Sequence, residues 1–108
     1  MLRDTYPNSP ELFQEKAELL KALAHPVRLC IVKLLMELGS ANVTHLQSCS
    51  QAPQSTISQH LGKLRTAKIL EARRQGPEIY YTLVNEDAKR IVSILFPNSK
   101  IFNEGGKP

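Results

Sequence analysis

The sequence predicts a mainly α-helical domain that carries one small β-hairpin, in the order helix, helix, helix, helix, strand, strand, helix. Apolar residues recur every three or four positions through most of the chain, which is the periodicity of amphipathic helices. Between residues 69 and 84 this pattern gives way to alternation, and β-branched and aromatic residues become dense. The change of period therefore marks two strands before the last helix.

Length and composition limit the chain to one modest domain. It has 108 residues, of which 42% are hydrophobic and 22% charged, as in soluble globular proteins. No apolar run approaches the roughly 20 residues of a membrane span, and the N-terminus lacks the apolar segment of a secretory signal, so we expect a cytoplasmic protein. We expect the domain at 9–97, after a flexible arm at 1–8 and before a disordered tail at 98–108.

The first two helices are delimited by residues typical of helix ends. Ser9 is placed to cap the first helix, and Pro10 occupies its first turn. The second helix opens at Pro26 and stops at Gly39, and His25 at its entrance is predicted to be a cap or a hydrogen-bonding hinge rather than a metal ligand.

The remaining elements follow from caps and turns. A short third helix begins after Asn42, and a turn at 50–53 leads into a fourth helix at about 53–68. The strands are expected at 69–74 and 78–84, and Asn85 is expected to cap the last helix, which Pro97 ends.

The third and fourth helices have the size of a helix-turn-helix, in which the second helix lies in the DNA major groove. The fourth helix has no acid between Ala52 and Lys68, where a carboxylate would meet phosphates. Its glutamines can pair bidentately with adenine, and its hydroxyls can serve bases or phosphates. We predict DNA contacts from Gln54, Ser55, Thr56, Ser58, Gln59, His60, Lys63 and Arg65.

The basic charge is concentrated on the fourth helix and the strand that follows it. Residues 60–74 contain five basic residues and one acid, an excess equal to the +4 of the whole chain. A basic hairpin beside a polar helix can clamp the backbone or the minor groove. The sequence therefore predicts a winged helix-turn-helix that binds double-stranded DNA, with wing contacts from Arg73, Arg74 and Gln75.

Other classes of function have less support. The chain has no Gly-rich phosphate loop, no nucleophile elbow and no Cys-His-acid set, so we expect no enzyme, no cofactor and no small-molecule substrate. A winged helix that binds protein is the alternative. Such domains tend to lose the basic wing or to carry acids on the recognition helix, and neither is the case here.

Three blocks of this sequence resemble the ArsR/SmtB family of winged-helix transcriptional regulators. Residues 21–31 are similar to the start of the family's second helix, 53–65 to its recognition helix, and 74–81 to its wing. The resemblance covers about residues 11–96. Within the family, the details are most similar to the non-metal type of protective-antigen repressors.

The resemblance implies a repressor that acts as a homodimer on a palindromic operator, with the dimer built from the first and last helices. Both helices carry more apolar residues than a core of this size needs, and such a surplus is commonly buried against a twofold mate. The alternative is that these side chains only cover the single core. The expected interface residues are Leu12, Phe13, Leu20, Ile91, Ile94 and Leu95.

The resemblance also argues against the family's usual metal sites. One site uses Cys-x-Cys at the start of the third helix, where this chain has Asn42 and Thr44. Another uses Asp and His on the last helix, but no histidine follows His60. His45 and Cys49, four residues apart, could still begin a zinc site completed across a dimer; otherwise they are a polar and a packing residue.

The two cysteines leave redox control open as an alternative. They are too few for a disulfide framework, and cytosolic thiols are usually kept reduced. Redox-sensing relatives carry one cysteine where this chain has Lys33 and another on the last helix, which has none here. Cys30 and Cys49 can pair only if their Cα atoms lie within about 6 Å.

Overall fold

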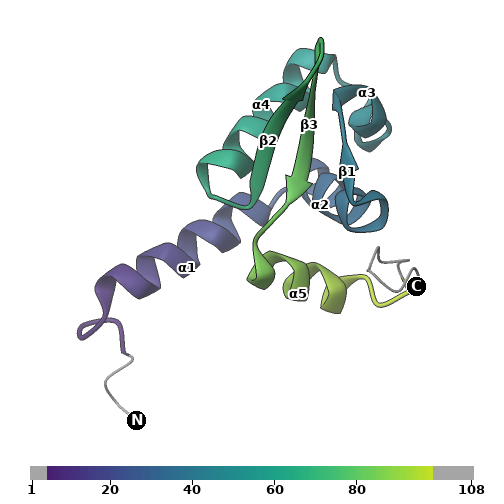
Figure 1. Cartoon of the computed structure of the whole chain (residues 1–108). Coiled ribbons are helices and arrows are strands. Elements are labelled where there is room, and N and C mark those ends of the chain that lie inside the picture. Colours follow the sequence, from purple (N-terminus) through teal and green to yellow (C-terminus); the bar gives the residue numbers. More distant parts are fainter. Residues whose placement is uncertain (1–4, 99–108) are drawn as a thin grey trace.

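The computed structural model describes residues 5–98 and confirms a mainly helical winged helix-turn-helix (Figure 1). The tail expected at 98–108 lies outside the described residues except for Asn98, as do the first four residues of the arm. The elements are α1 (Pro10–Leu23), α2 (Pro26–Leu38), β1 (Ser40–Ala41), α3 (Val43–Leu46), the 3-10 helix η2 (Gln47–Cys49), α4 (Gln54–Thr66), β2 (Leu70–Gln75), β3 (Glu78–Leu83) and α5 (Glu86–Leu95). Within residues 5–98, no helix is both long and apolar enough to cross a membrane.

The hairpin forms part of a three-stranded antiparallel sheet with the order β1-β3-β2. Strand β1, which the sequence did not predict, pairs Ser40 with Thr82 of β3. Two residues are too few to show the alternation that identifies a strand in a sequence. The hairpin pairs Arg73 of β2 with Tyr80 of β3, and this register decides which wing residues share a face.

Helix α4 ends earlier than the sequence predicted, at Thr66 rather than Lys68. Lys68 has a φ of 62°, in the left-handed region that a helix cannot continue through. The chain turns there, and the Ile69 amide donates to the Leu64 carbonyl at 2.9 Å. This tight reversal places the wing directly beside the recognition helix.

The predicted caps at His25, Asn42 and Asn85 are present. Ser9, predicted to cap α1, occupies the N-cap position but makes no capping side-chain hydrogen bond. His25 Nδ1 accepts a hydrogen bond from the Val27 amide at 3.1 Å. The Asn42 side chain accepts from the His45 amide at 2.9 Å, and His45 Nδ1 accepts from the Asn42 amide at 3.2 Å. This reciprocal pair is a capping box, in which each residue satisfies the other's free backbone N–H.

The core lies between α2, α4, the sheet and α5. Three apolar residues of α4, Ile57, Leu61 and Leu64, are completely buried, and their spacing of four and three residues in the sequence is that of one helix face. They pack in the same core as Ile31 and Leu35 of α2. Because one stripe of α4 is buried in this way, its polar stripe must face outward.

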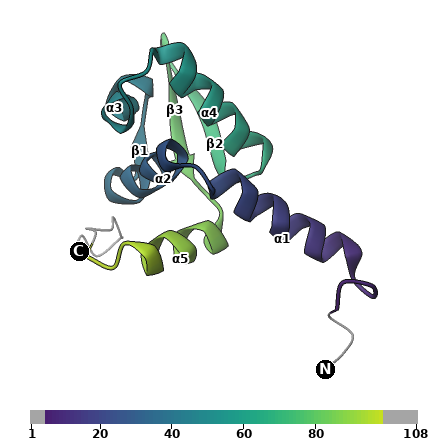
Figure 2. The ribbon, with the colours of Figure 1, turned by 180° about the vertical axis from the view of Figure 1, so that it is seen from behind.

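Helix α1 is only partly supported by the rest of the chain. Figures 1 and 2 show its N-terminal half running away from the other elements. Every residue from Pro10 to Glu18 is exposed, and Leu19 is its first buried residue. An unsupported stretch of helix is marginal in water, so this half has a surface available for a partner.

Candidate nucleic-acid interface

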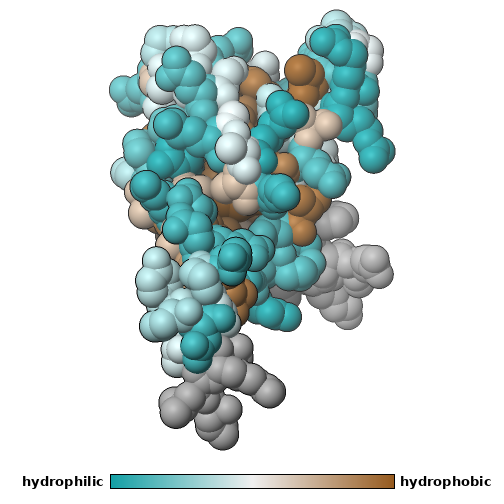
Figure 3. All heavy atoms as spheres, turned by 90° about the vertical axis from the view of Figure 1, so that its left-hand side faces the viewer, coloured by the Kyte–Doolittle hydropathy of each residue, from teal (hydrophilic) through white to brown (hydrophobic). Residues whose placement is uncertain are grey.

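The outward face of α4 carries most of the residues that the sequence selected for DNA contact. Gln54, Ser55, Ser58 and Gln59 are exposed along its N-terminal half, and Lys63 and Arg65 are exposed further along. Thr56 is half-buried. On the side of the molecule that carries α4, hydrophilic side chains predominate (Figure 3). The face therefore offers hydrogen-bonding groups with no competing carboxylate on the helix.

Two open grooves flank α4, and both include Gly62 and Thr66 in their linings. The groove on the wing side has a volume of about 960 Å³ and is lined by Arg65, Arg73, Gln75 and Tyr80, among others. The groove on the α1 side has a volume of about 920 Å³. Helix α4 is thus a ridge with a hollow on each side.

The predicted wing residues are divided between the two faces of the hairpin. Arg73 and Gln75 line the wing-side groove. Arg74 follows Arg73 directly in the strand, so its side chain leaves from the opposite face. At the tip of the hairpin, Arg74 Nη1 lies 3.4 Å from the carbonyl oxygen of Gly76. Gly76 lies in the turn and has a positive φ of 63°. The sequence analysis predicted all three residues as wing contacts. The alternation of side chains along a strand places Arg74 on the opposite face from Arg73 and Gln75.

His60, which was predicted to contact DNA, is half-buried and contacts residues at the start of α2. Its Nδ1 lies 3.0 Å from Nη1 of Arg28, and its ring centroid lies 4.4 Å from that of His25. A guanidinium can only donate, so Nδ1 must be the unprotonated acceptor. Burial lowers the pKa of His60, and the nearby charges of His25, Arg28 and Lys63 lower it further.

Arg28 connects this histidine to the end of α1. Its Nε donates to the Ala22 carbonyl at 2.6 Å, while its Nη1 holds His60. The recognition helix is thereby tied to the junction between α1 and α2. Sequence reasoning did not select Arg28, because its partners lie six and 32 residues away.

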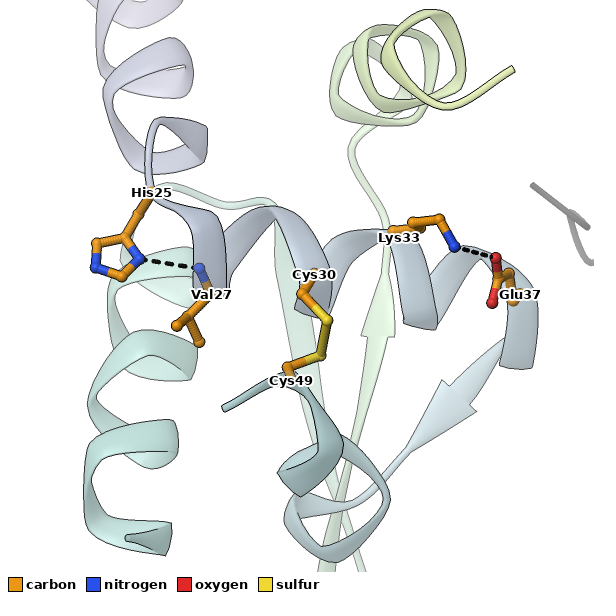
Figure 4. The surroundings of a disulfide bond; sticks show 6 residues. All are labelled: His25, Val27, Cys30, Lys33, Glu37 and Cys49. Carbon is orange, nitrogen blue, oxygen red and sulfur yellow. Dashed lines mark hydrogen bonds and ion pairs between the residues drawn. A yellow bond between two sulfur atoms is a disulfide. The ribbon is translucent and has the colours of Figure 1, made fainter. Parts of the chain in front are cut away.

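The two cysteines form a disulfide between α2 and η2, with a Cα–Cα distance of 5.5 Å (Figure 4). Cytosolic thiols are usually reduced, but Cys30 and Cys49 are bonded to each other in this structure. Their Cα–Cα distance lies within the limit of about 6 Å that a disulfide requires. Cys49 lies five residues before the start of α4, so the bond ties the turn of the helix-turn-helix to α2.

The zinc alternative at His45 and Cys49 finds no support in this geometry. Cys49 is bonded to Cys30, and His45 Nδ1 is occupied by the Asn42 amide. In the described part of the chain, no three His, Cys, Asp or Glu side chains are grouped so that they could hold a metal ion.

Paired and unpaired cations are segregated along residues 5–98. Lys16, Lys33, Lys89 and Arg90 form ion pairs with acids. Between residues 21 and 74, every other lysine and arginine lacks a carboxylate oxygen within 4 Å. These seven uncompensated cations lie at the end of α1, on α2, on α4, in the turn after α4 and on β2, which are the elements around the ridge. They are Lys21, Arg28, Lys63, Arg65, Lys68, Arg73 and Arg74.

A helix-turn-helix followed by a basic hairpin defines a winged-helix regulator of transcription that binds DNA. Residues 25–72 match the family described as "Bacterial regulatory protein, arsR family", and the chain belongs to this family. The chain is 46% identical over 84 residues to the transcriptional repressor PagR of Bacillus anthracis, an alignment that covers 78% of this chain and 84% of PagR. It is 40% identical over 101 residues to the biofilm growth-associated repressor of Xylella fastidiosa, covering 89% and 88%.

Solved structures agree with this assignment. The crystal structure of PagR matches with a TM-score of 0.71 and 45% identity, covering 79% of this chain and 97% of that one. The repressor BigR from Xylella fastidiosa matches with a TM-score of 0.73 and 39% identity, covering 86% and 94%. These relatives are regulators of transcription, so the predictions of a DNA-binding regulator and of no enzymatic activity are confirmed.

The environment of His60 predicts a pH dependence of stability. Its folded-state pKa lies below the ordinary 6.5, so as the pH falls the unfolded chain takes up the proton first. The contribution of neutral His60 to stability is complete above pH 6.5 and is lost progressively below it. Urea unfolding at pH 7.5, 6.5 and 5.5 measures this loss.

Two variants assign that loss to His60. His60→Gln keeps an acceptor for Arg28 without a titrating ring, so its unfolding free energy should fall less over this range. His45→Gln is the control, because glutamine also serves at that capping position and the fall should remain. Equal pH dependence in wild type and His60→Gln would contradict the assignment.

Proposed function

We propose that this protein is a transcriptional repressor that acts in the cytoplasm as a homodimer on a palindromic DNA operator. Helix α4 enters the major groove, and the β2–β3 wing lies against the neighbouring backbone or minor groove. The observation that carries the proposal is the outward face of α4, which is free of acids and surrounded by uncompensated cations.

The side chains on this face divide into two roles. Gln54 and Gln59 are exposed amides that can read a base edge, while Ser55 and Ser58 are short enough for bases or phosphates. Arg65 and Arg73 line the wing-side groove and suit phosphate oxygens. The neutral set determines sequence selectivity, and the cations supply salt-dependent affinity.

The proposed dimer uses the apolar surface left on α1 and α5. Leu20 is 54% exposed, Ile94 76% and Leu95 54%, with Leu12 and Phe13 at 40% each. Ile91, the remaining predicted interface residue, is partly buried against the core. A twofold axis would cover this surface and support the projecting half of α1. Two half-sites about 34 Å apart would then be read together.

The DNA-binding proposal is tested with a duplex selected from a random pool and a scrambled duplex of equal length, at 50 and 200 mM salt. Selective binding that weakens steeply with salt supports it. No binding to either duplex at low salt would favour a winged helix that binds protein.

Two substitutions should separate base reading from phosphate binding. Gln59→Ala should reduce discrimination at one base pair by about 1–3 kcal/mol. Arg73→Ala should weaken binding to all duplexes alike and reduce the salt slope by about 1. Competition titrations with duplexes mutated at single positions measure both effects. A uniform loss for Gln59→Ala would contradict its base-reading role.

The dimer is tested by a charge in its centre. Ile94→Asp should convert the dimer to folded monomers, because a carboxylate would be buried against apolar side chains. Leu38→Asp is the control, since Leu38 is also an exposed apolar residue but lies on α2 and is not among the proposed interface residues. Sedimentation velocity with circular dichroism measures both. An intact Ile94→Asp dimer would place the interface elsewhere.

A second candidate function is redox-responsive repression, and the 5.5 Å between the Cα atoms of Cys30 and Cys49 favours it. Oxidation by hydrogen peroxide removes a proton and an electron from each thiol, forms the Sγ–Sγ bond and yields two water molecules. The disulfide restrains the turn before α4. We therefore expect this turn to be less mobile in the oxidised protein than in the reduced protein.

The redox proposal predicts different DNA affinities after peroxide and after dithiothreitol. The oxidised protein should bind the selected duplex more tightly and should be more stable by about 3 kcal/mol, the scale for closing a loop of this size. Cys49→Ser should give the same affinity and stability under both treatments. Equal affinities for the two wild-type forms would reject redox control.

A further inference from the structure

We propose that the groove between α1 and α4 receives the sugar–phosphate backbone of one DNA strand, while the wing-side groove receives that of the other. This inference rests on the proposed function and extends its contact surface to α1. Lys21 and Lys63 bind phosphate oxygens in this groove. Lys21 was not among the residues that the sequence selected for DNA contact.

The shape of the surface is the first argument. A B-DNA major groove is about 12 Å wide and an α-helix with its side chains is about 10–12 Å across. A helix lying in the groove therefore has one backbone on each side. Helix α4 has one hollow on each side, of about 920 and 960 Å³, and Gly62 and Thr66 line both.

The residues of α4 on this side allow a close approach. Gln59, Gly62, Lys63 and Thr66 line the groove and share one helix face, because they occupy positions i, i+3, i+4 and i+7. A Cβ atom added to Gly62 would meet nothing within 4 Å, so the surface there is open. A backbone in either hollow can therefore come close to the helix at Gly62.

Charge is the second argument. Lys21, Arg28 and Lys63 line this groove, and none has a carboxylate oxygen within 4 Å in the described part of the chain. Arg28 lines the groove and is held by the Ala22 carbonyl and by His60, so its charge is fixed in position. The ammonium groups of Lys21 and Lys63 remain available to an anion.

The acid in the groove does not neutralise these cations. Glu18 is the one carboxylate among the described lining residues, and its Oε2 accepts a hydrogen bond from Gln14 on the previous turn of α1 at 3.0 Å. Three cations and one anion leave the lining with a net positive charge, which suits a polyanionic backbone.

The groove is separate from the face assigned to the dimer. Glu18, Lys21 and Ala22 line the groove. At about 100° per residue, Leu20 lies about 160° around α1 from Glu18 and Ala22 and about 100° from Lys21, and Phe13 lies about 80° from Lys21 and at least about 140° from the other two. The same helix can therefore serve a partner protomer on one side and DNA on the other.

The test compares Lys21→Gln with Lys89→Gln, which removes the same charge from α5, where Lys89 pairs with Glu86. Binding of the full chain to a fluorescent 30-base-pair duplex is measured from 50 to 300 mM salt. Lys21→Gln should reduce the slope of log K against log salt by about 0.9, and the affinity at 0.1 M salt by about eightfold. Lys63→Gln should behave alike, and Lys89→Gln should match wild type. Equal melting temperatures show that the fold is unaffected.

Ethylation interference on the selected duplex locates the contact. Lys21→Gln should remove interference at phosphates of one strand and leave the wing-side phosphates unchanged. A wild-type slope for Lys21→Gln, or loss of the same phosphates in Arg73→Ala, would overturn this inference but not the proposed function. Failure of the wild-type protein to bind duplex DNA at low salt would overturn both.

Discussion

The burial of Ile57, Leu61 and Leu64 is the constraint on which the rest of the structure depends. These three side chains fix the rotation of α4 about its own axis, because turning the helix would expose them to water. The polar stripe, the two flanking grooves and the position of the wing all follow from that rotation. A core contact of ordinary hydrophobic chemistry thus determines which side chains can reach a DNA base.

Local patterns predicted the elements well, because their signals lie within a few residues. The caps at His25 and Asn42 were predicted correctly, and the buried residues of α4 follow the helical spacing of apolar residues in the sequence. Strand β1 was missed because two residues carry no periodicity. The opposite orientations of Arg73 and Arg74 were available from strand alternation and were overlooked.

Features that depend on tertiary geometry could not be predicted in the same way. The contact of Arg28 with His60 joins residues 32 positions apart, and nothing local to either indicates the other. The distance between Cys30 and Cys49 was identified as the deciding quantity, but only the packing of α2 against η2 supplies its value. The groove beside Lys21 likewise exists only once α1 and α4 are placed together.

Gly62 has a consequence for how this protein balances stability against binding. A glycine inside an exposed helix costs about 1 kcal/mol relative to alanine. Nothing in the free protein accounts for it, since a Cβ atom at this position would touch no neighbour within 4 Å. Replacing Gly62 with alanine would therefore raise the free energy of unfolding of the unbound protein. The added methyl group would also thicken the ridge of α4 where DNA approaches. In the proposed complex, folding and recognition impose opposite preferences on this residue, and glycine is the one that favours recognition.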